Sequence, residues 1–294
     1  MKTGLSETIE RLSQADDSTD FFYKYDNKEA MPSVDILKEI ISLARSILFP
    51  GYFGNSNVNG DTLIYHIGLN IEKLLTLLTG QIKAGLCFEQ FDKKSGREDL
   101  CKTAKEKAIA LLKLLPDIKE QLHTDVIAAY NGDPAAKSPG EIIFCYPGVR
   151  AISSYRFANA LLRLGVPLIP RIISEMAHSE TGIDIHPGAT IGNYFTIDHG
   201  TGVVIGETTV IGNNVKIYQG VTLGAKSFPL DKDGNPIKGV DRHPKIGNNV
   251  IIYSNSTVLG NIKVGDGAII GGNIWVDVEV PAGARLIQQE KRSE

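Results

Sequence analysis

The sequence predicts an α+β protein, with an N-terminal α-helical domain over residues 1–180 followed by a parallel β-helix of hexapeptide repeats over residues 181–294. Aliphatic residues return at every sixth position in the second part, a short fixed period that is typical of a solenoid. Apolar residues in the first part are instead spaced three and four apart, as on one face of an α-helix. One long excursion, over residues 224–245, interrupts the period and exceeds an ordinary connection in length.

Turn-forming residues divide the helical part into successive amphipathic segments. Pro50-Gly51 ends the first segment, residues 131–140 form a turn-rich connector, and Gly165 with Pro167 ends a later segment. The expected helices span residues 32–48, 61–86, 100–115, 117–130 and 148–164, and a last one ends near His178.

The six-residue period predicts a coil with flat sides, each about one hexapeptide long. The aliphatic residue of each side points inward and stacks on its equivalent three repeats later, so each coil buries its face only against its neighbours. Glycine and asparagine follow many of these positions and suit the corners, because both tolerate positive φ. The inward residues are expected at 185, 191, 197 and 203, then at 205, 211, 217 and 223, and after the excursion at 246, 252, 258, 264, 270 and 276.

The period slips first between Ile197 and Ile205, where two extra residues must bulge outward because the inward register resumes intact. The bulge is expected to hold Asp198 and His199 near the surface, beside a glycine-rich backbone. Asp184 lies just over two repeats earlier, and residues one or two coils apart can be neighbours in a stacked solenoid. A carboxylate is therefore expected within reach of the imidazole.

The second slip is the excursion itself, which ends in Arg242 and His243 where the chain rejoins the coil. A fixed positive charge and a second imidazole at this point, combined with the polar residues of the first slip, suit general-base chemistry on a small charged substrate. His186 precedes a proline, and we expect it to have a structural role in a turn. Each of these polar residues also has a simpler interpretation as a turn cap, an ion-pair partner or a solvated side chain.

Composition limits the classes of protein that fit. The chain has 294 residues, of which 42% are hydrophobic and 22% charged, and a formal net charge of −3, which is ordinary for a globular protein and gives no reason to expect nucleic acid. No apolar run approaches the roughly 20 residues of a membrane span, and the N-terminus lacks a signal-peptide core, so we expect a cytoplasmic protein. Cys87, Cys101 and Cys145 are expected to be buried, reduced thiols.

At these motifs the chain resembles the serine acetyltransferases, hexapeptide-repeat enzymes that make O-acetylserine for cysteine synthesis. The resemblance covers residues 131–272. Hexapeptide repeats alone would indicate only the acyltransferase superfamily, but the ordered set of motifs is far more specific. The motifs are Asp133-Pro-Ala, a GxxAxxxYR pattern that starts at Gly148 and ends in Tyr155-Arg156, Asp184-Ile-His-Pro, Asp198-His-Gly-Thr-Gly, Gly202-Val-Val-Ile-Gly-Glu-Thr, Val221-Thr-Leu-Gly and Asp241-Arg-His-Pro-Lys-Ile.

The resemblance implies a role for each matching residue. His199 is the general base toward the serine hydroxyl, and Asp184 orients and stabilises its imidazole. The implied substrate-binding residues are Asp133 and Asp198 for the ammonium, and Arg242 and His243 for the carboxylate. The co-substrate acetyl-CoA is implied to bind along the coils near Gly224, Ala225, Ser254 and Gly272, and no metal is expected.

The resemblance also implies a left-handed β-helix, active sites between neighbouring subunits, and helical N-terminal domains that join trimers into hexamers. L-cysteine is an expected feedback inhibitor that binds in the serine site. Residues 285–294 are short and lack a terminal isoleucine, so the sequence does not support a stable complex with O-acetylserine sulfhydrylase. The same short end leaves the adenine end of the acetyl-CoA site undefined, and the loop before Asp241 is longer than in well-known bacterial members.

Three alternatives remain open from the sequence. The acceptor hydroxyl can belong to homoserine or a sugar, although the charged residues favour an amino acid. A zinc hydrolyase with His186, His199 and His243 as ligands is a second alternative, because zinc often binds three histidines and a water, as in the γ-type carbonic anhydrases with the same coil. A non-catalytic scaffold, with the helical domain as the interaction element, is the third.

Overall fold

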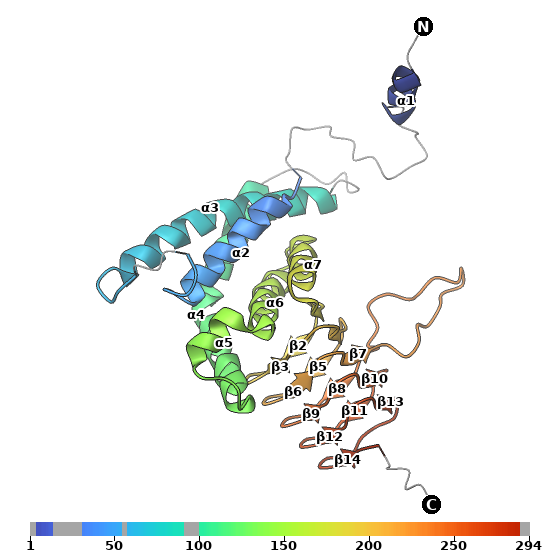
Figure 1. The fold of residues 1–294 in the computed structure, drawn as a ribbon. Helices are drawn as coiled ribbons and strands as arrows, with labels where there is room; N and C mark the ends of the chain where they lie inside the picture. The colour runs from blue at the N-terminus through green and yellow to red at the C-terminus, as the bar shows by residue number, and fades with distance from the viewer. Residues whose placement is uncertain (1–3, 14–30, 55–57, 91–99, 289–294) are drawn as a thin grey trace, which may run out of the picture. The chain divides into compact units, whose positions relative to one another are not determined.

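The computed structural model describes residues 4–13, 31–54, 58–90 and 100–288 of the chain. It forms two compact units, Met1–Met31 and Pro32–Glu294. The first contains α1 (Gly4–Ser13), a helix that the sequence analysis did not predict. In the second, helices precede a stack of short strands (Figure 1). No helix within the described ranges is long and apolar enough to cross a membrane.

Most predicted helices of the second unit are confirmed to within a few residues. The two segments predicted at 100–115 and 117–130 are instead one helix, which continues through Pro116. The apolar face runs on across the proline, from Leu111 and Leu115 to Ile118 and Leu122, and its burial offsets the hydrogen bond that proline removes. The helices are α2 (Val34–Leu48), α3 (Leu63–Gln90), α4 (Leu100–Gly132), α5 (Pro139–Cys145), α6 (Pro147–Arg163) and α7 (Ile169–Thr181).

Helix α5 follows the predicted connector and was not predicted. Its start has ordinary sequence signals: Ser138 caps it by accepting the N–H of Glu141, and Pro139 occupies the first turn. The thiols also differ from expectation, because Cys101 and Cys145 are exposed and only Cys87 is partly buried. The buried thiols that we predicted are therefore wrong at these two positions.

The second half of the unit is a parallel β-helix with three sheets, which confirms the predicted fold class. Sheet I is β1-β4-β7-β10-β13, sheet II is β2-β5-β8-β11, and sheet III is β3-β6-β9-β12-β14. The strands are β1 (Asp184–Ile185), β2 (Thr190–Ile191), β3 (Thr196–Asp198), β4 (Val204–Ile205), β5 (Val210–Ile211), β6 (Lys216–Tyr218), β7 (Thr222–Gly224), β8 (Lys245–Ile246), β9 (Ile251–Ile252), β10 (Thr257–Leu259), β11 (Lys263–Val264), β12 (Ile269–Ile270), β13 (Trp275–Val276) and β14 (Arg285–Leu286).

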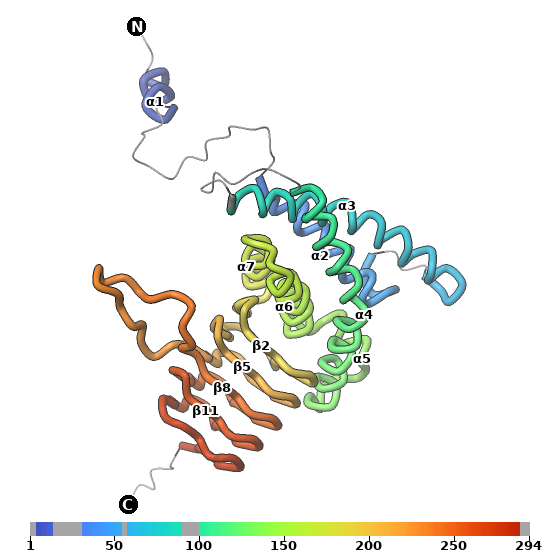
Figure 2. The backbone as a smooth tube through the Cα atoms, turned by 180° about the vertical axis from the view of Figure 1, so that it is seen from behind, coloured from blue at the N-terminus to red at the C-terminus, as the bar shows by residue number. Residues whose placement is uncertain are grey.

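The predicted inward register is confirmed strand by strand. In sheet I, Ile185 lies opposite Ile205, which lies opposite Leu223, and the row continues through buried residues Val258 and Val276. Ile185 and Ile205 are two residues further apart than the period requires, so the first slip is absorbed within one coil, as predicted. The second slip is the excursion between β7 and β8, which projects from the coils as the long orange loop in Figure 2.

The three sheets meet at edges, and two of these edges matter for the site. The III–I edge consists of residues 199–203 and the equivalent turns 219–221, 253–256 and 271–274. The I–II edge consists of residues 186–189 and 206–209, the excursion at 225–244, and the turns 260–262 and 277–279. Both edges border sheet I, on its opposite sides.

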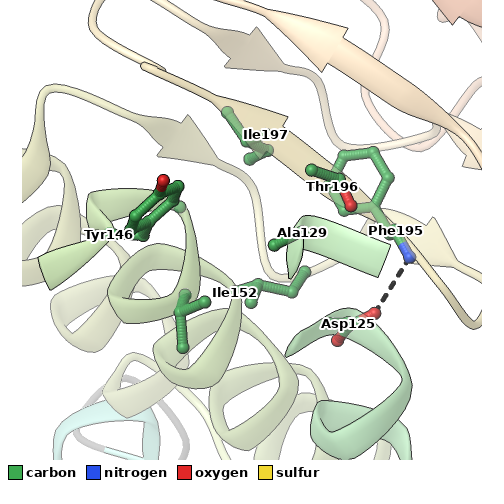
Figure 3. Close-up of a pocket in the computed structure, with 9 residues that line it drawn as sticks. Asp125, Ala129, Tyr146, Ile152, Phe195, Thr196 and Ile197 are labelled. Carbon is green, nitrogen blue, oxygen red and sulfur yellow. Dashed lines mark hydrogen bonds between the residues drawn. The ribbon is translucent and has the colours of Figure 1, made fainter. Parts of the chain in front are cut away.

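Helices α4 and α6 pack on the first coil, where a buried ion pair joins them. Nε and Nη2 of Arg156 donate to the two carboxylate oxygens of Asp125 over 2.7 and 2.9 Å, and Nη2 also donates to the carbonyl of Gly192. Asp125 in turn accepts the backbone N–H of Phe195, the bond that Figure 3 draws. Nearer the start of α6, Gly148 packs against the backbone carbonyl of Ile197 so closely that a Cβ atom would have no room. The helices therefore hold β3, and the residues that follow it, in one position.

Candidate active site

The III–I edge presents His199 to solvent. Its backbone has a φ of 57°, in the left-handed region that non-glycine residues rarely adopt. Its side chain is 75% exposed, and its Nε2 lies 4.0 Å from Oδ1 of Asp198. The predicted bulge is confirmed, and it leaves the imidazole able to contact a ligand.

Lys216 connects this edge to the end of α4. Its Nζ lies 3.0 Å from Oδ2 of Asp198 and donates to the carbonyl of Gly132 over 2.7 Å. Burial lowers the pKa of Lys216, but its contacts with Tyr218 and Asp198 outweigh burial and leave the pKa above its ordinary value. Lys216 therefore remains an ammonium that holds residue 132 beside Asp198. No signal in the sequence marks Lys216, because it lies on a regular strand with no slip nearby.

Asp133 follows directly and shares its carboxylate between two donors. Tyr146 donates its hydroxyl to Oδ2 over 2.5 Å, and the backbone N–H of Ala135 donates to Oδ1 over 2.8 Å. The Tyr146 bond holds the pKa of Asp133 below its ordinary value, and the same bond raises the pKa of Tyr146 to about 12. Asp133 is therefore an anion, and the charge of Lys216 lowers its pKa further. The structure thus brings Asp133, Asp198 and His199 to one edge, and it adds Tyr146.

Asp184 begins β1 in sheet I, beside the III–I edge and one coil away from His199. It opposes Val204, and the neighbouring Gly182 accepts a hydrogen bond from Gly202, so the segments 182–184 and 202–204 run side by side. Its half-buried carboxylate forms no hydrogen bond with His199 in the described part of the chain, where the ring lies nearer to Asp198. A direct bond between Asp184 and His199 stays a prediction for the enzyme with its substrates bound.

The I–II edge holds the guanidinium of Arg242. Its Nη2 donates to Oε2 of Glu207 over 2.5 Å, and its backbone N–H donates to the hydroxyl of Thr208 over 3.0 Å. The bond from Arg242 also holds the pKa of Glu207 below its ordinary value. The neighbouring Asp241 pairs with Lys245, at 3.3 Å. Glu207 and Thr208 were quoted only as part of a motif, although they lie in the turn that faces the second slip.

His243 is buried at this edge, with only 6% of its surface exposed. Its Nδ1 accepts the backbone N–H of Thr208 over 3.1 Å. His186 lies in the same edge and accepts the N–H of Gly188 through its own Nδ1, at 3.0 Å, which agrees with the turn role that we predicted for it. Burial, followed by the charge of Arg171, lowers the pKa of His186.

The candidate residues therefore lie on two edges of one chain. Ser254 and Gly272 lie in turns of the III–I edge, with His199, and Gly272 packs against the Ser254 carbonyl. Gly224 ends β7, with Ala225 next to it, at the I–II edge with Arg242 and His243. Within the described residues no group of three metal-binding side chains forms.

The comparisons with known proteins agree with this architecture. The family model for the bacterial transferase hexapeptide, with six repeats, matches residues 243–273. A plasmid serine acetyltransferase of Synechococcus elongatus is 49% identical over 297 residues, which covers 99% of this chain and 92% of that protein. Entamoeba histolytica serine acetyltransferase 1, crystallised with L-cysteine, has 37% identity and a TM-score of 0.74 over 96% of both chains. Neisseria gonorrhoeae serine acetyltransferase, crystallised with serine, has 26% identity and a TM-score of 0.56 over 90% of this chain and 99% of that one.

The coils and the repeat match define the class of protein first: a hexapeptide-repeat transferase built on a left-handed β-helix. Identity along almost the whole chain narrows the class further. The chain belongs to the serine acetyltransferase family, and it is an acyltransferase enzyme. The zinc hydrolyase and the non-catalytic scaffold are therefore set aside.

Proposed function

We propose that the enzyme transfers the acetyl group of acetyl-CoA to the hydroxyl of L-serine and so forms O-acetyl-L-serine for cysteine synthesis. One observation in the structure supports L-serine as the acceptor, in addition to family membership. An exposed imidazole, His199, lies at the same edge as two carboxylates, Asp133 and Asp198, that suit an ammonium. A sugar acceptor would have no charge to match them.

His199 acts as the general base in this proposal. It removes the proton of the serine hydroxyl as the oxygen attacks the thioester carbonyl, which a neutral alcohol does poorly by itself. The C–S bond then breaks, and the imidazolium returns the proton to the leaving thiolate of CoA. Asp184, one coil away, stabilises the imidazolium when a bound ligand turns the ring toward it. No covalent acetyl-enzyme is needed, because both substrates meet at the imidazole.

The substrate is held at both of its charged ends. Asp133 and Asp198 bind the ammonium, because each carboxylate keeps free lone pairs beside its existing partners. Arg242 and His243 bind the carboxylate, for which a guanidinium offers paired N–H donors. L-cysteine has the same two charged groups as L-serine, so it competes for this site as a feedback inhibitor.

The two edges imply a site shared between subunits. Both edges border sheet I. The outward-facing side chains of this sheet include Val204 and Trp275, which are 37% and 65% exposed. Packing sheet I of three chains around a threefold axis covers this row and brings the III–I edge of one chain against the I–II edge of the next. Acetyl-CoA binds in the same cleft, through Ser254 and Gly272 of one chain and Gly224 and Ala225 of its neighbour. The assembly is such a trimer or a dimer of two trimers joined through their helices, and residues 1–180 and 181–294 act as the oligomerisation and transferase domains.

One further expectation belongs to this proposal. The enzyme works in the cytoplasm, where exposed free thiols such as Cys101 and Cys145 persist. Residues 289–294 lie outside the described part of the chain.

The direct test is a CoA-release assay with acetyl-CoA and a panel of acceptors. We expect turnover with L-serine, and inhibition by L-cysteine that is relieved by more L-serine. L-homoserine, which is one methylene longer, is expected to react at least tenfold more slowly, because the extra methylene displaces the hydroxyl from His199. If L-homoserine or a sugar reacted as fast as L-serine or faster, that compound would be the acceptor and the proposed specificity for L-serine would be wrong.

Mixed oligomers test the shared site. Chains carrying His199→Ala and chains carrying Arg242→Ala are each expected to be nearly inactive at low L-serine. In a mixed trimer one site of the three combines an intact III–I edge with an intact I–II edge, so about one third of the wild-type activity returns. Co-expression with two affinity tags isolates the mixed species. If the two edges of one chain formed the site, no mixture would recover activity.

A further inference from the structure

The hydroxyl of Thr208 lies at the I–II edge, where the excursion rejoins the coil. Its Oγ1 accepts the backbone N–H groups of Arg242, over 3.0 Å, and of His243, over 3.2 Å. The same oxygen lies 2.8 Å from Nδ1 of His243, and that nitrogen also accepts the backbone N–H of Thr208, over 3.1 Å. One side chain therefore contacts both members of the carboxylate clamp, from more than thirty residues away in sequence.

These bonds determine which ring nitrogen of His243 carries the proton. A backbone N–H can only donate, so Nδ1 must present its lone pair to Thr208 and carries no proton. The two lone pairs of Oγ1 are taken by two backbone donors, so the hydroxyl hydrogen also points to Nδ1. The proton of the neutral ring is therefore on Nε2. This nitrogen has no hydrogen-bond partner within the described ranges and is the donor left for a ligand.

We propose that Thr208 is a positioning residue for substrate recognition, which holds His243 as a neutral Nε2–H donor beside Arg242 so that both bind the substrate carboxylate. The inference rests on the proposed function, since it assigns the clamp to the carboxylate of L-serine. It gives the two histidines separate tasks. His199 exchanges protons during the reaction, whereas His243 keeps its proton and only donates a hydrogen bond.

The surroundings of His243 support a ring that stays neutral. Gly206 covers its Cδ2–Nε2 edge so closely that no Cβ fits there. Burial, followed by the charge of Arg242, lowers the pKa of His243 to about 4. This value is below the ordinary one of about 6.5, so the folded ring takes up no proton between pH 6 and 8. The titratable and charged groups that face it are Arg242, Glu207, His186 and Lys245.

Thr208→Val and Thr208→Ser form a matched pair, because valine keeps the volume and loses the hydroxyl, whereas serine keeps the hydroxyl. In the full-length enzyme at saturating acetyl-CoA, we expect Thr208→Val to raise the KM for L-serine about tenfold and to leave kcat within about threefold, since the clamp binds substrate and transition state alike. Thr208→Ser is expected to stay within about threefold of the wild type in both constants. The Ki of L-cysteine should rise by the same factor as the KM.

An NMR measurement on the wild-type enzyme tests the tautomer without any change at Thr208. In protein labelled with ¹⁵N-histidine, and with His243→Gln to assign the signal, we expect the Nε2–H tautomer and no titration from pH 6 to 8. A charged ring, or the Nδ1–H tautomer, would overturn the proposal, as would an unchanged KM in a folded Thr208→Val enzyme. Lack of any CoA release with L-serine in the wild type would instead overturn the proposed function and leave the tautomer result standing.

Discussion

Replacement of His199 by alanine is expected to lower kcat by about 10²- to 10⁴-fold, the usual cost of removing a general base. The imidazole is exposed at the III–I edge, on a residue whose backbone is in the left-handed region. Within the described residues it forms no hydrogen bond with another side chain, so its loss should not disturb the fold. The KM values for L-serine and acetyl-CoA should change little, because the charged clamps remain. Steady-state CoA release at saturating substrates measures the loss.

His123→Ala is the matched control, since His123 is also an exposed histidine but lies on α4. It is expected to retain the activity of the wild type. The thermal unfolding midpoint of both variants should stay close to that of the wild type, which separates a chemical defect from a folding defect. Near-normal turnover in a folded His199→Ala enzyme would remove His199 from the proposed mechanism.

Replacement of Arg156 by methionine is expected to destabilise the fold by about 3–5 kcal/mol, because it leaves the Asp125 carboxylate buried without its partner. The two side chains are 3% and 1% exposed, and their bidentate contact joins α4 and α6 to the first coil. Burial already raises the pKa of Asp125, and the Arg156 charge opposes that rise. Urea unfolding followed by circular dichroism, at one protein concentration, measures the effect.

Arg171→Met provides the control for the loss of an exposed ion pair. Arg171 contacts Glu175 at 2.5 Å on α7, with both side chains about half exposed, so the expected cost is at most about 1 kcal/mol. The double variant Arg156→Met with Asp125→Leu should be more stable than Arg156→Met alone, since no charge then stays buried. A cost below about 1 kcal/mol for Arg156→Met would show that this pair does not hold the helices on the coil.

The coil was predictable residue by residue because its signal is local. Each side of the coil needs one inward aliphatic residue, and the register from Ile185 to Val276 follows from the sequence alone. The bulge at His199 follows for the same reason, since two inserted residues cannot enter a packed interior. The helix through Pro116 was not predictable from the local pattern, because burial of its apolar face against other helices outweighs the lost hydrogen bond.

The separation of the candidate residues onto two edges is present in the sequence. Each coil has three sides, one for each sheet. The first slip follows β3, which is the third side of its coil, whereas the excursion follows β7, which is the first side of its coil. His199 and Arg242 therefore cannot share an edge of one chain. The expected cleft is therefore divided. A neighbouring chain has to complete it in our proposal.

The sequence by itself determined the family, the division of the chain into a helical part and a β-helix, the register of the coils and the positions of both slips. Each of these follows from the spacing of apolar residues or from short sequence motifs. Only the tertiary structure decided the partners of the polar side chains. Lys216 meets the carbonyl of Gly132, Tyr146 meets Asp133, and Thr208 meets His243. The physical reason is that a hydrogen bond depends on which side chains share a corner after folding, and no period in the sequence records that.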